Sequence, residues 1–442
     1  MNEEHLEQAC LNWLSGLGYT CLHGDEVSPG GAQEARERYS EVVLAPRLRQ
    51  AVSRLNPALS NGQVDQVVTR LATYGAQSIV DGNKEVYEWL RNGVPLEVTE
   101  ADGRRTVLRV PVIDFAGRND LLAVRQFTIH GQKIRRPDIT LFVNGLPLVV
   151  IELKNPANLN ADYEAAYNQI QTYKADIPQL FWFNLLNVIS DGTVARYGSL
   201  SADLSRHSRW RLLDGKKVDK GQLELEVLIR GLLEPRTLLD FFRGFVAYGG
   251  SDGGSTFKII AQWHQYHGVR KAVDRALEAL TQRKDGKGGV IWFTQGSGKS
   301  LMALFYVMAL RDRPEFQNPT VVVVTDRNDL DGQLYETFAE SAWSLRATPV
   351  QANSREELRD QLSSVQAGGV FFTTINKFAP EIGKTSVPVL CDRSNVVVIA
   401  DEAHRTQYGF RADLDSATGQ TKYGLAKYMR DALPNAIYLG MT

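Results

Sequence analysis

The chain has 442 residues and a formal net charge of −1, with 43% hydrophobic and 23% charged residues. This composition is typical of a soluble globular protein of two or three domains, and it excludes nucleic-acid binding through overall positive charge. The 3 cysteines are too few for a disulfide framework, and no apolar run reaches the roughly 18 residues of a membrane span. Because the charged start is not a signal peptide, we expect a cytoplasmic protein with no membrane contact.

The first half of the chain is expected to pass from helices to strands. Residues 1–24 predict an amphipathic helix, and residues 35–94 predict mostly helical structure. Between residues 107 and 154, four segments rich in β-branched and aromatic residues predict strands: VLRVPVIDF, LLAVRQFTI, DITLFV and LPLVVIEL. A helix over residues 161–176 and the apolar segment FWFNLLNVIS continue this mixed α/β unit.

Ionisable side chains interrupt the apolar segment RRPDITLFVNGLPLVVIELKNP. Alternate residues of a strand share a face, so Glu152 and Lys154 point the same way. Asp138, on the neighbouring strand, can join Glu152 as a ligand of Mg²⁺, with the carbonyl of Leu153 as a further ligand. Lys154 would then position or activate an attacking water. The alternative is a buried salt bridge, because buried charges require partners.

The geometry of the turn between these two strands decides whether Asp138 and Glu152 can share a metal ion. Asn144-Gly145 predicts a tight hairpin turn, since both residues accept the positive φ that it requires. A strict two-residue turn pairs position 138 with position 151, and Glu152 then faces away from Asp138. A shared metal site therefore requires an odd-length loop or a bulge that restores the parity. We predict such an irregularity.

The low-complexity stretch YGGSDGGS, within residues 236–255, is predicted to be a linker between two domains, 1–235 and 256–442. The first domain would carry the helical segment as an insertion. After the linker, apolar segments alternate with stretches long enough for helices: GVIWFT, TVVVVTD, GVFFTT, NVVVIAD and AIYLGMT. This alternation predicts a parallel sheet covered on both faces.

The segment TQGSGKS, residues 294–300, lies between an apolar strand and a helical run, which is the context of a phosphate-binding loop. Its glycines let backbone N–H groups turn towards an anion at a helix N-terminus. Lys299 would reach the β- and γ-phosphates, and Ser300 would bind Mg²⁺. The general pattern has Gly where this chain has Phe293. The loop residues expected to contact ATP are Thr294, Gln295, Gly296, Ser297, Gly298, Lys299 and Ser300.

The segment NVVVIADEAH, residues 395–404, is a second nucleotide-site motif. An apolar strand that ends in two acids places Asp401 and Glu402 at the carboxyl edge of the sheet. Asp401 would hold Mg²⁺ through water, and Glu402 would orient and deprotonate the water that attacks the γ-phosphate. Together the two motifs predict ATP hydrolysis.

These motifs resemble motifs I and II of superfamily 2 helicases and translocases. VVVVTDRNDLDGQL resembles motif Ia, FFTTINKF a DNA-contacting motif, and YLGMT the start of motif III. QWHQYHGVRKAV resembles the adenine-reading Q motif, which implies that Gln265 reads the base. Because the chain ends at Thr442, inside motif III, the resemblance implies an amino-terminal fragment that lacks the second RecA-like lobe. Such a fragment is expected to bind ATP but hardly hydrolyse it.

The first domain resembles restriction-endonuclease-like nucleases, whose D…(E/D)xK pattern matches Asp138, Glu152 and Lys154. QIQTY fits QxxxY, an accessory motif of the subgroup with RecB-like and type I restriction nucleases, which implies catalytic roles for Gln169 and Tyr173. The same resemblance places Glu7 at that subgroup's amino-terminal acid. An exposed Glu on a surface helix is the alternative for this residue.

A nuclease domain before a DEAH motor is the arrangement of the restriction (R) subunit of type I restriction-modification enzymes, and the resemblance covers nearly the whole chain. It implies a phage-defence enzyme that uses ATP and Mg²⁺ to translocate double-stranded DNA and to cut unmethylated DNA far from the recognition site. Its partners would be methylation and specificity subunits. The alternatives are a RecB-like nuclease-translocase without methyltransferase partners and a non-catalytic DNA-tracking scaffold.

Overall fold

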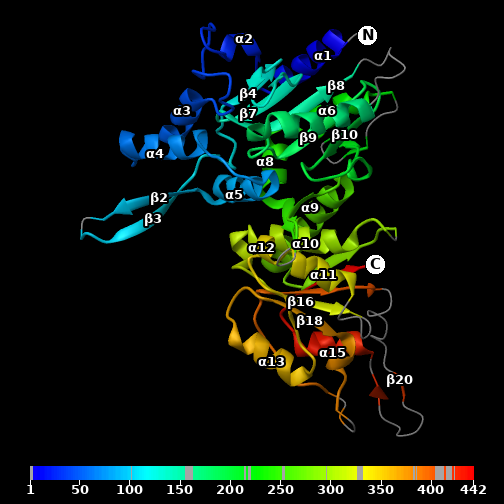
Figure 1. Ribbon diagram of the computed structural model, residues 1–442. Coiled ribbons are helices and arrows are strands. Elements are labelled where there is room, and N and C mark those ends of the chain that lie inside the picture. Colours follow the sequence, from blue (N-terminus) through cyan, green and yellow to red (C-terminus); the bar gives the residue numbers. More distant parts are fainter. Residues whose placement is uncertain are drawn as a thin grey trace. The chain divides into compact units, whose positions relative to one another are not determined.

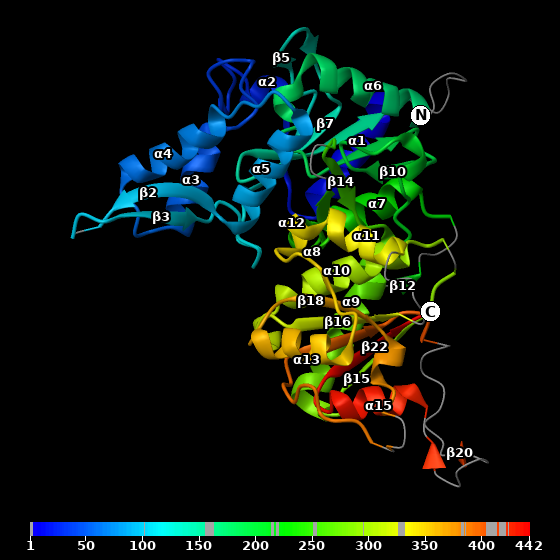
Figure 2. The ribbon, with the colours of Figure 1, turned by 60° about the horizontal axis from the view of Figure 1, so that its bottom comes forward.

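The structure, a computed structural model, describes residues 3–100, 102–154, 163–213, 216–217, 221–250, 254–294, 296–325, 332–381, 384, 386–403, 413–414, 421–422 and 424–442. The chain forms two compact units, shown in Figures 1 and 2. Unit 1 contains Met1–Val246 and Thr256–Trp263, and unit 2 contains Ala247–Ser255 and His264–Thr442. Among the described residues, no helix has the length and apolar character needed to cross a membrane.

Unit 1 combines helices with a mixed sheet. Its helices are α1 (Glu3–Gly16), α2 (Gly24–Val27), α3 (Ala45–Leu55), α4 (Asn61–Ala72), α5 (Ile79–Asn92), α6 (Tyr163–Asp176), α7 (Glu224–Leu232) and α8 (Pro235–Gly244). Its strands are β1 (Thr20–His23), β2 (Val94–Thr99), β3 (Arg105–Val110), β4 (Leu121–Arg125), β5 (Ile129–His130), β6 (Ile134–Arg135), β7 (Ile139–Val143), β8 (Leu146–Leu153), β9 (Leu186–Ser190), β10 (Ala195–Gly198), β11 (Leu212–Leu213), β12 (Lys216–Lys217) and β14 (Phe257–Ile260).

The main sheet of unit 1 has six strands in the order β1-β4-β7-β8-β9-β10. The β4–β7–β8 strands form an antiparallel meander, whereas β1 runs parallel to β4 and β9 runs parallel to β8. All residues of β7, β8 and β9 are buried, which explains their near-continuous apolar sequences. Helix α6 packs on β8 and β9, and α1 packs on β1, β4 and β8.

Helix α1 is shorter than predicted. Its buried face contains Leu6, Cys10, Leu11 and Leu14, as the amphipathic pattern indicates, but the helix ends at Gly16. The chain then reverses through Gly18, with φ 94°, and continues as β1. The prediction of helix up to residue 24 was therefore wrong, because pairing with β4 decides the conformation of this short segment.

The predicted helical insertion consists of α3, α4 and α5, after which β2 pairs with β3 as an antiparallel hairpin. The Ser60 hydroxyl accepts a hydrogen bond from the Gln63 backbone N–H, and the Gln63 side chain accepts one from the Ser60 N–H. This capping box satisfies two of the N–H groups that a helix start leaves without partners. Helix α5 begins at a similar cap, where the Ser78 hydroxyl accepts from the Asp81 N–H.

Unit 2 is built around a parallel sheet. Its helices are α9 (Trp263–Glu278), α10 (Lys299–Arg311), α11 (Gln333–Glu340), α12 (Ala342–Leu345), α13 (Arg355–Ser364) and α15 (Leu425–Ala432). Its strands are β13 (Val246–Gly249), β15 (Lys287–Ile291), β16 (Thr320–Thr325), β17 (Val350–Gln351), β18 (Val370–Thr374), β19 (Val396–Ala400), β20 (Asp413–Leu414), β21 (Thr421–Lys422) and β22 (Ile437–Met441). Strand β13 begins at Val246, the last residue of the first segment of unit 1, and its other residues belong to unit 2.

The sheet of unit 2 has six strands in the order β15-β22-β19-β16-β18-β17, and every neighbouring pair is parallel. This confirms the parallel sheet and, with the mixed sheet of unit 1, the α/β class. The central strands β16, β18, β19 and β22 are buried along their whole length. A parallel order places the carboxyl ends of these strands at one edge, where ligands bind in open α/β sheets.

Part of the predicted linker is ordinary folded structure. Residues 235–244 form α8, and Tyr248 belongs to β13 and is 1% exposed. The Tyr248 N–H donates a hydrogen bond of 2.8 Å to the Ser344 hydroxyl, within unit 2. The glycine-rich part of the linker, residues 251–253, lies outside the described residues.

Candidate functional sites

A β-bulge between β7 and β8 brings the predicted nuclease acids together. Asn144 and Gly145 form the turn with φ 53° and 79°, and Val143 pairs with Leu146 next to it. The register then shifts between Leu141 and Phe142, so that Ile139 pairs with Ile151. Continued by one residue, this register places Asp138 opposite Glu152. The predicted irregularity is confirmed, and it restores the parity that a regular hairpin would lack.

Asp138 and Glu152 each accept a hydrogen bond from a residue at or directly after the end of β8. The Leu153 N–H donates to Oδ2 of Asp138 at 2.7 Å, which ties the carboxylate to the neighbouring strand. The Lys154 ammonium donates to Oε1 of Glu152, also at 2.7 Å. A salt bridge is therefore present between these two side chains, as one reading of the sequence required, and Asp138 lies next to it.

Burial opposes ionisation of the Asp138 and Glu152 carboxyl groups. Asp138 is 5% exposed and Glu152 is 2% exposed. Burial raises the pKa of Asp138 to about 6, although the Leu153 N–H and the charge of Lys154 oppose the rise. Burial and then the charge of Asp138 raise the pKa of Glu152 to about 8. Burial lowers the pKa of Lys154, but the charge and hydrogen bond of Glu152, together with the charges of Asp138 and Glu3, outweigh burial and the net shift is upward.

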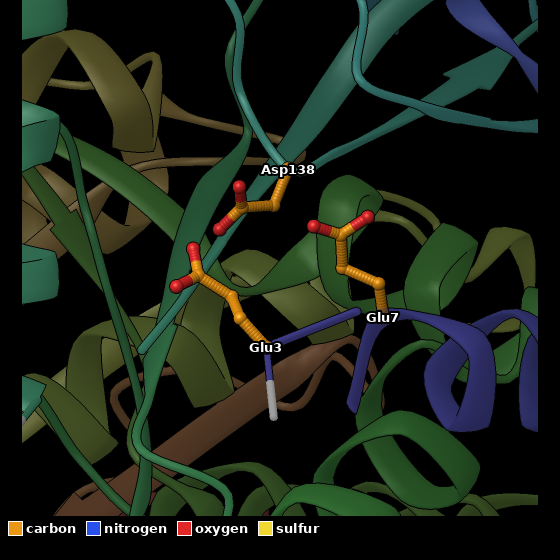
Figure 3. Close-up of side chains that lie close together, drawn as sticks. All are labelled: Glu3, Glu7 and Asp138. Carbon is orange, nitrogen blue, oxygen red and sulfur yellow. The ribbon is translucent and has the colours of Figure 1, made fainter. Parts of the chain in front are cut away.

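Two glutamates of α1 extend this acidic group. Glu3 and Glu7 lie one helical turn apart, and their carboxylates converge on that of Asp138, as Figure 3 shows. One oxygen from each of the three side chains lies within 4.8 Å of the others. Glu7 is 5% exposed, so it is not the exposed surface residue of the alternative interpretation, and burial followed by the charge of Asp138 raises its pKa to about 7.

Helix α6 places the QxxxY pair next to these acids. Tyr173 is 3% exposed, and its hydroxyl lies 3.4 Å from the carbonyl oxygen of Arg136. Burial and then the negative charge of Glu152 raise the pKa of Tyr173, and a hydrogen bond with Gln169 partly opposes the rise. The i and i+4 spacing therefore brings both side chains to one face of α6, as predicted.

The nuclease residues fit a divalent cation. Oε2 of Glu152 is buried and has no hydrogen-bond partner among the described residues. Such an atom is costly to bury unless something binds it. Carboxylate oxygens are the ligands that Mg²⁺ prefers, and the nearby oxygens of Asp138 and Glu7 belong to groups of the same kind.

The predicted phosphate loop leads into α10, which begins at Lys299. Gly296 and Gly298 have φ 81° and 77°, a conformation that glycine adopts without strain. The Ser297 hydroxyl is buried and has no partner among the described residues, so the loop also contains a polar atom available to a ligand. Ser300 lies in the first turn of α10, where the helix dipole favours an anion.

The acids of the second motif meet the loop at the end of β19. The Asp401 N–H donates to the Val324 carbonyl oxygen at 2.9 Å, and burial raises the pKa of the Asp401 carboxyl. Glu402 has φ 46°, an unusual value for a residue with a side chain. Its Oε1 lies 3.1 Å from the Lys299 ammonium, so the two motifs are in contact across the carboxyl edge of the sheet.

Gln265 is placed against the phosphate loop. It is 1% exposed, and its side-chain amide donates to the carbonyl oxygens of Ser297 and Gly298 at 3.4 and 3.2 Å. The Ser297 N–H in turn donates to Thr294, which is exposed. Gln295, the remaining predicted loop residue, and residues 326–331 and 404–412 of the neighbouring motifs lie outside the described residues.

Sequence reasoning missed two polar residues beside the candidate nuclease acids, Glu3 and Gln126. The available signal for Glu3 was its spacing, since it precedes Glu7 by four residues on a predicted helix. Gln126 follows β4, and its side-chain amide donates to Oε1 of Glu7 at 2.7 Å. Nothing in its local sequence indicated this contact, because the partners come from distant parts of the chain.

Comparisons with known proteins find relatives of both halves of the chain. Residues 1–206 match the family described as the type I restriction enzyme R protein N terminus, and residues 264–442 match the SWI2/SNF2 ATPases. Over its whole length the chain is 45% identical to the type I restriction enzyme HindI endonuclease subunit of Haemophilus influenzae, and it spans 42% of that protein. The type I restriction enzyme SauCOLORF180P endonuclease subunit of Staphylococcus aureus is 26% identical over 92% of the chain, which spans 40% of that relative.

Proposed function

We propose that this chain, whose residues 1–206 match the type I restriction enzyme R protein N terminus and whose residues 264–442 match the SWI2/SNF2 ATPases, is part of an ATP-driven DNA translocase and endonuclease. It would act in the cytoplasm, in complex with methylation and specificity subunits, and cut foreign unmethylated double-stranded DNA away from the recognition site. The DNA sequence would be read by the specificity subunit.

In the nuclease site, Asp138 and Glu152 would hold Mg²⁺, with the Leu153 carbonyl as a further ligand. A bound Mg²⁺ would supply a Lewis acid that polarises the scissile phosphate and lowers the pKa of a coordinated water. Lys154 is held by Glu152 at 2.7 Å and would orient the attacking water on that side of the site. Tyr173 and Gln169 would support Glu152 from α6, since the hydroxyl of Tyr173 is within electrostatic reach of the carboxylate.

In the motor site, the backbone N–H groups of the loop and Lys299 would bind the phosphates of ATP. Ser300 and Asp401 would hold the Mg²⁺ that accompanies the nucleotide. Glu402 would accept a proton from the attacking water. Lys299 and Glu402 form an ion pair, so ATP binding would replace that partner of Lys299 by phosphate and release Glu402 for the water. Gln265 would support the loop and read the adenine.

One observation carries the nuclease half of this proposal. The bulge between β7 and β8 places a second carboxylate opposite Glu152, although a salt bridge with Lys154 needs no partner on β7. A purely structural Lys154–Glu152 ion pair does not require Asp138, and burying the charged Asp138 carboxylate is unfavourable. A shared cation accounts for both acids.

The experiment compares two lysine variants of the full-length subunit in complex with its partners. Lys154→Ala should abolish DNA cleavage and leave DNA-stimulated ATP hydrolysis near the wild-type rate, whereas Lys299→Ala should abolish both. Lys133→Ala, whose side chain is 70% exposed, is the matched control and should change neither. Cleavage by the Lys154→Ala enzyme at the wild-type rate would return Asp138, Glu152 and Lys154 to a structural role.

A pull-down distinguishes this proposal from a RecB-like nuclease-translocase. The full-length subunit should co-purify with a methyltransferase and a specificity subunit, and the complex should spare DNA that this methyltransferase has modified. Equal cleavage of modified and unmodified DNA without these partners would favour the RecB-like alternative.

A further inference from the structure

Gln126 adopts a backbone conformation that is unusual for its side chain. It follows β4 directly and has φ 57°, in the left-handed region that glycine, asparagine and aspartate tolerate best. Its carbonyl group is packed tightly against the start of α2, since a Cβ atom added to Gly24 would lie 2.1 Å from the Gln126 oxygen. Only glycine fits at position 24 while Gln126 stays in this conformation. Backbone strain of this kind is often found at functional sites.

The conformation aims both polar groups of Gln126 at the nuclease acids. Its backbone N–H donates to the Asp138 carbonyl oxygen at 2.8 Å, at the start of β7. Its side-chain nitrogen Nε2 lies 2.7 Å from Oε1 of Glu7 and 3.4 Å from Oδ1 of Asp138. One amide group with two N–H donors therefore links a carboxylate on α1 to a carboxylate beside β7.

These two carboxylates would not stay together by themselves. Glu7 and Asp138 are both about 5% exposed, and like charges at short range in a buried site repel each other. The Leu153 N–H donates a hydrogen bond to Asp138 and so stabilises the charge of that carboxylate. Arg125 approaches Oε2 of Glu7 only to 3.6 Å. The amide of Gln126 is the shortest contact of the Glu7 carboxylate among these, and it faces Asp138 as well.

We propose that Gln126 is a positioning residue, which holds Glu7 against Asp138 so that Glu7 joins Asp138 and Glu152 as a ligand of the divalent cation. The proposal rests on the nuclease function proposed above. Gln126 itself contacts no cation, because its nitrogen faces the carboxylates as a donor. Its removal lets Glu7 turn away from Asp138, and the cation loses a ligand.

The test uses two variants that keep the backbone conformation. Gln126→Asn shortens the side chain beyond reach of Glu7, and Gln126→Gly removes it, while both residues accept a positive φ. Mg²⁺ binding to the full-length subunit is measured by calorimetry without DNA and ATP. We expect affinity to fall about tenfold to a hundredfold, the scale seen when residues that orient metal ligands are changed. The melting temperature should be unchanged or higher.

In the assembled enzyme, both variants should require a correspondingly higher Mg²⁺ concentration for DNA cleavage, while the Mg²⁺ dependence of ATP hydrolysis stays the same. Gln8→Asn is the matched control on α1, because Gln8 is exposed and its side-chain amide donates to Asn12, on the same helix. Wild-type Mg²⁺ affinity in Gln126→Asn and Gln126→Gly would overturn the proposal. So would a loss of affinity that is accompanied in both variants by a lower melting temperature, which indicates a structural role.

Asp138→Ala separates this inference from the function on which it rests. If Asp138→Ala abolishes both Mg²⁺ binding and cleavage while the Gln126 variants are normal, only the positioning role fails. If Asp138→Ala binds Mg²⁺ and cleaves DNA like the wild type, the nuclease site itself is wrongly assigned.

Discussion

Two Lys–Glu pairs, one from each candidate site, are built in opposite ways. Glu152 lies in β8 and Lys154 directly follows that strand; their side chains are 2.7 Å apart, and the Glu152 side chain is 2% exposed. Lys299 and Glu402 come from separate motifs more than a hundred residues apart. Their distance is 3.1 Å, and the Glu402 side chain is 38% exposed.

This difference indicates how each site meets its ligand. The nuclease pair is embedded in a sheet whose acids are already crowded, so a cation would enter a group of side chains that needs positive charge. The motor pair lies at the start of a helix beside a glycine-rich loop, where a partly solvated ion pair is worth little and is easily replaced by phosphate. We therefore propose that the acids of the first site are arranged before a cation binds, whereas Lys299 in the second site would exchange Glu402 for phosphate on ATP binding.

The largest expected effect comes from neutralising the buried glutamate. Glu152→Gln should lower DNA cleavage on the order of 10³-fold or more, the scale at which loss of an essential catalytic group acts, because it removes a charged ligand without changing the size of the side chain. DNA-stimulated ATP hydrolysis should stay within about twofold of the wild type. Glu164→Gln is the control, since Glu164 is an exposed residue of α6. Equal losses of cleavage and ATP hydrolysis would contradict two separate sites.

The corresponding change in the motor should affect chemistry more than binding. Glu402→Gln should lower the rate of ATP hydrolysis by about 10²–10³-fold, the size of effect seen for a single group that stabilises a transition state. ATP binding measured by calorimetry should be as tight as in the wild type or tighter, because Lys299 loses a competing partner. Weaker ATP binding in this variant would show that the ion pair supports the loop instead of exchanging with phosphate.

A smaller effect is expected at Tyr173, which supports Glu152 from α6. Tyr173→Phe removes only the hydroxyl, so we expect cleavage to fall roughly tenfold while the melting temperature changes by a few degrees at most. Tyr167→Phe, on the same helix, is the control. The hydroxyl has no part in the site if single-turnover cleavage by the Tyr173→Phe enzyme matches the wild-type rate.

The smallest effect is a pH dependence of the stability of unit 1. The pKa values of Asp138, Glu7 and Glu152 rise from ordinary values of 3.8, 4.5 and 4.5 to about 6, 7 and 8. A carboxyl group with a raised pKa favours the folded state at low pH, and that contribution is lost as pH rises through the folded-state value. Without metal, the melting temperature should therefore fall between pH 5.5 and 8.5, on the order of 5 °C.

Calorimetry in chelator and in Mg²⁺ measures this effect. Because metal ligands bind as carboxylates, Mg²⁺ should restore the melting temperature at pH 8.5 and change it little at pH 5.5. Asp138→Asn should show a shallower pH dependence than the wild type. A metal-free protein that becomes more stable towards pH 8.5 would contradict the crowding of these acids.

The sequence alone determined the features that depend on neighbouring residues. The apolar segments predicted most strands of both sheets, the glycine spacing predicted the phosphate loop, and the Asn144-Gly145 dipeptide predicted the hairpin turn, because these depend on local φ and ψ preferences and on the period of two along a strand. The same period, combined with the chemistry of a shared cation, predicted that the β7–β8 hairpin must be irregular. Short strands such as β1 escaped prediction, since four residues have no reliable pattern of their own.

Only the tertiary structure decided which side chains meet. It placed the bulge between Leu141 and Phe142, and it brought α1 and the end of β4 to Asp138. Gln126 and Glu7 are separated by more than a hundred residues, so no spacing in the sequence relates them. Their contact depends on how α1 packs on β4 and on the close approach that Gly24 permits. Contacts of this kind result from packing between distant segments, and local preferences do not contain them.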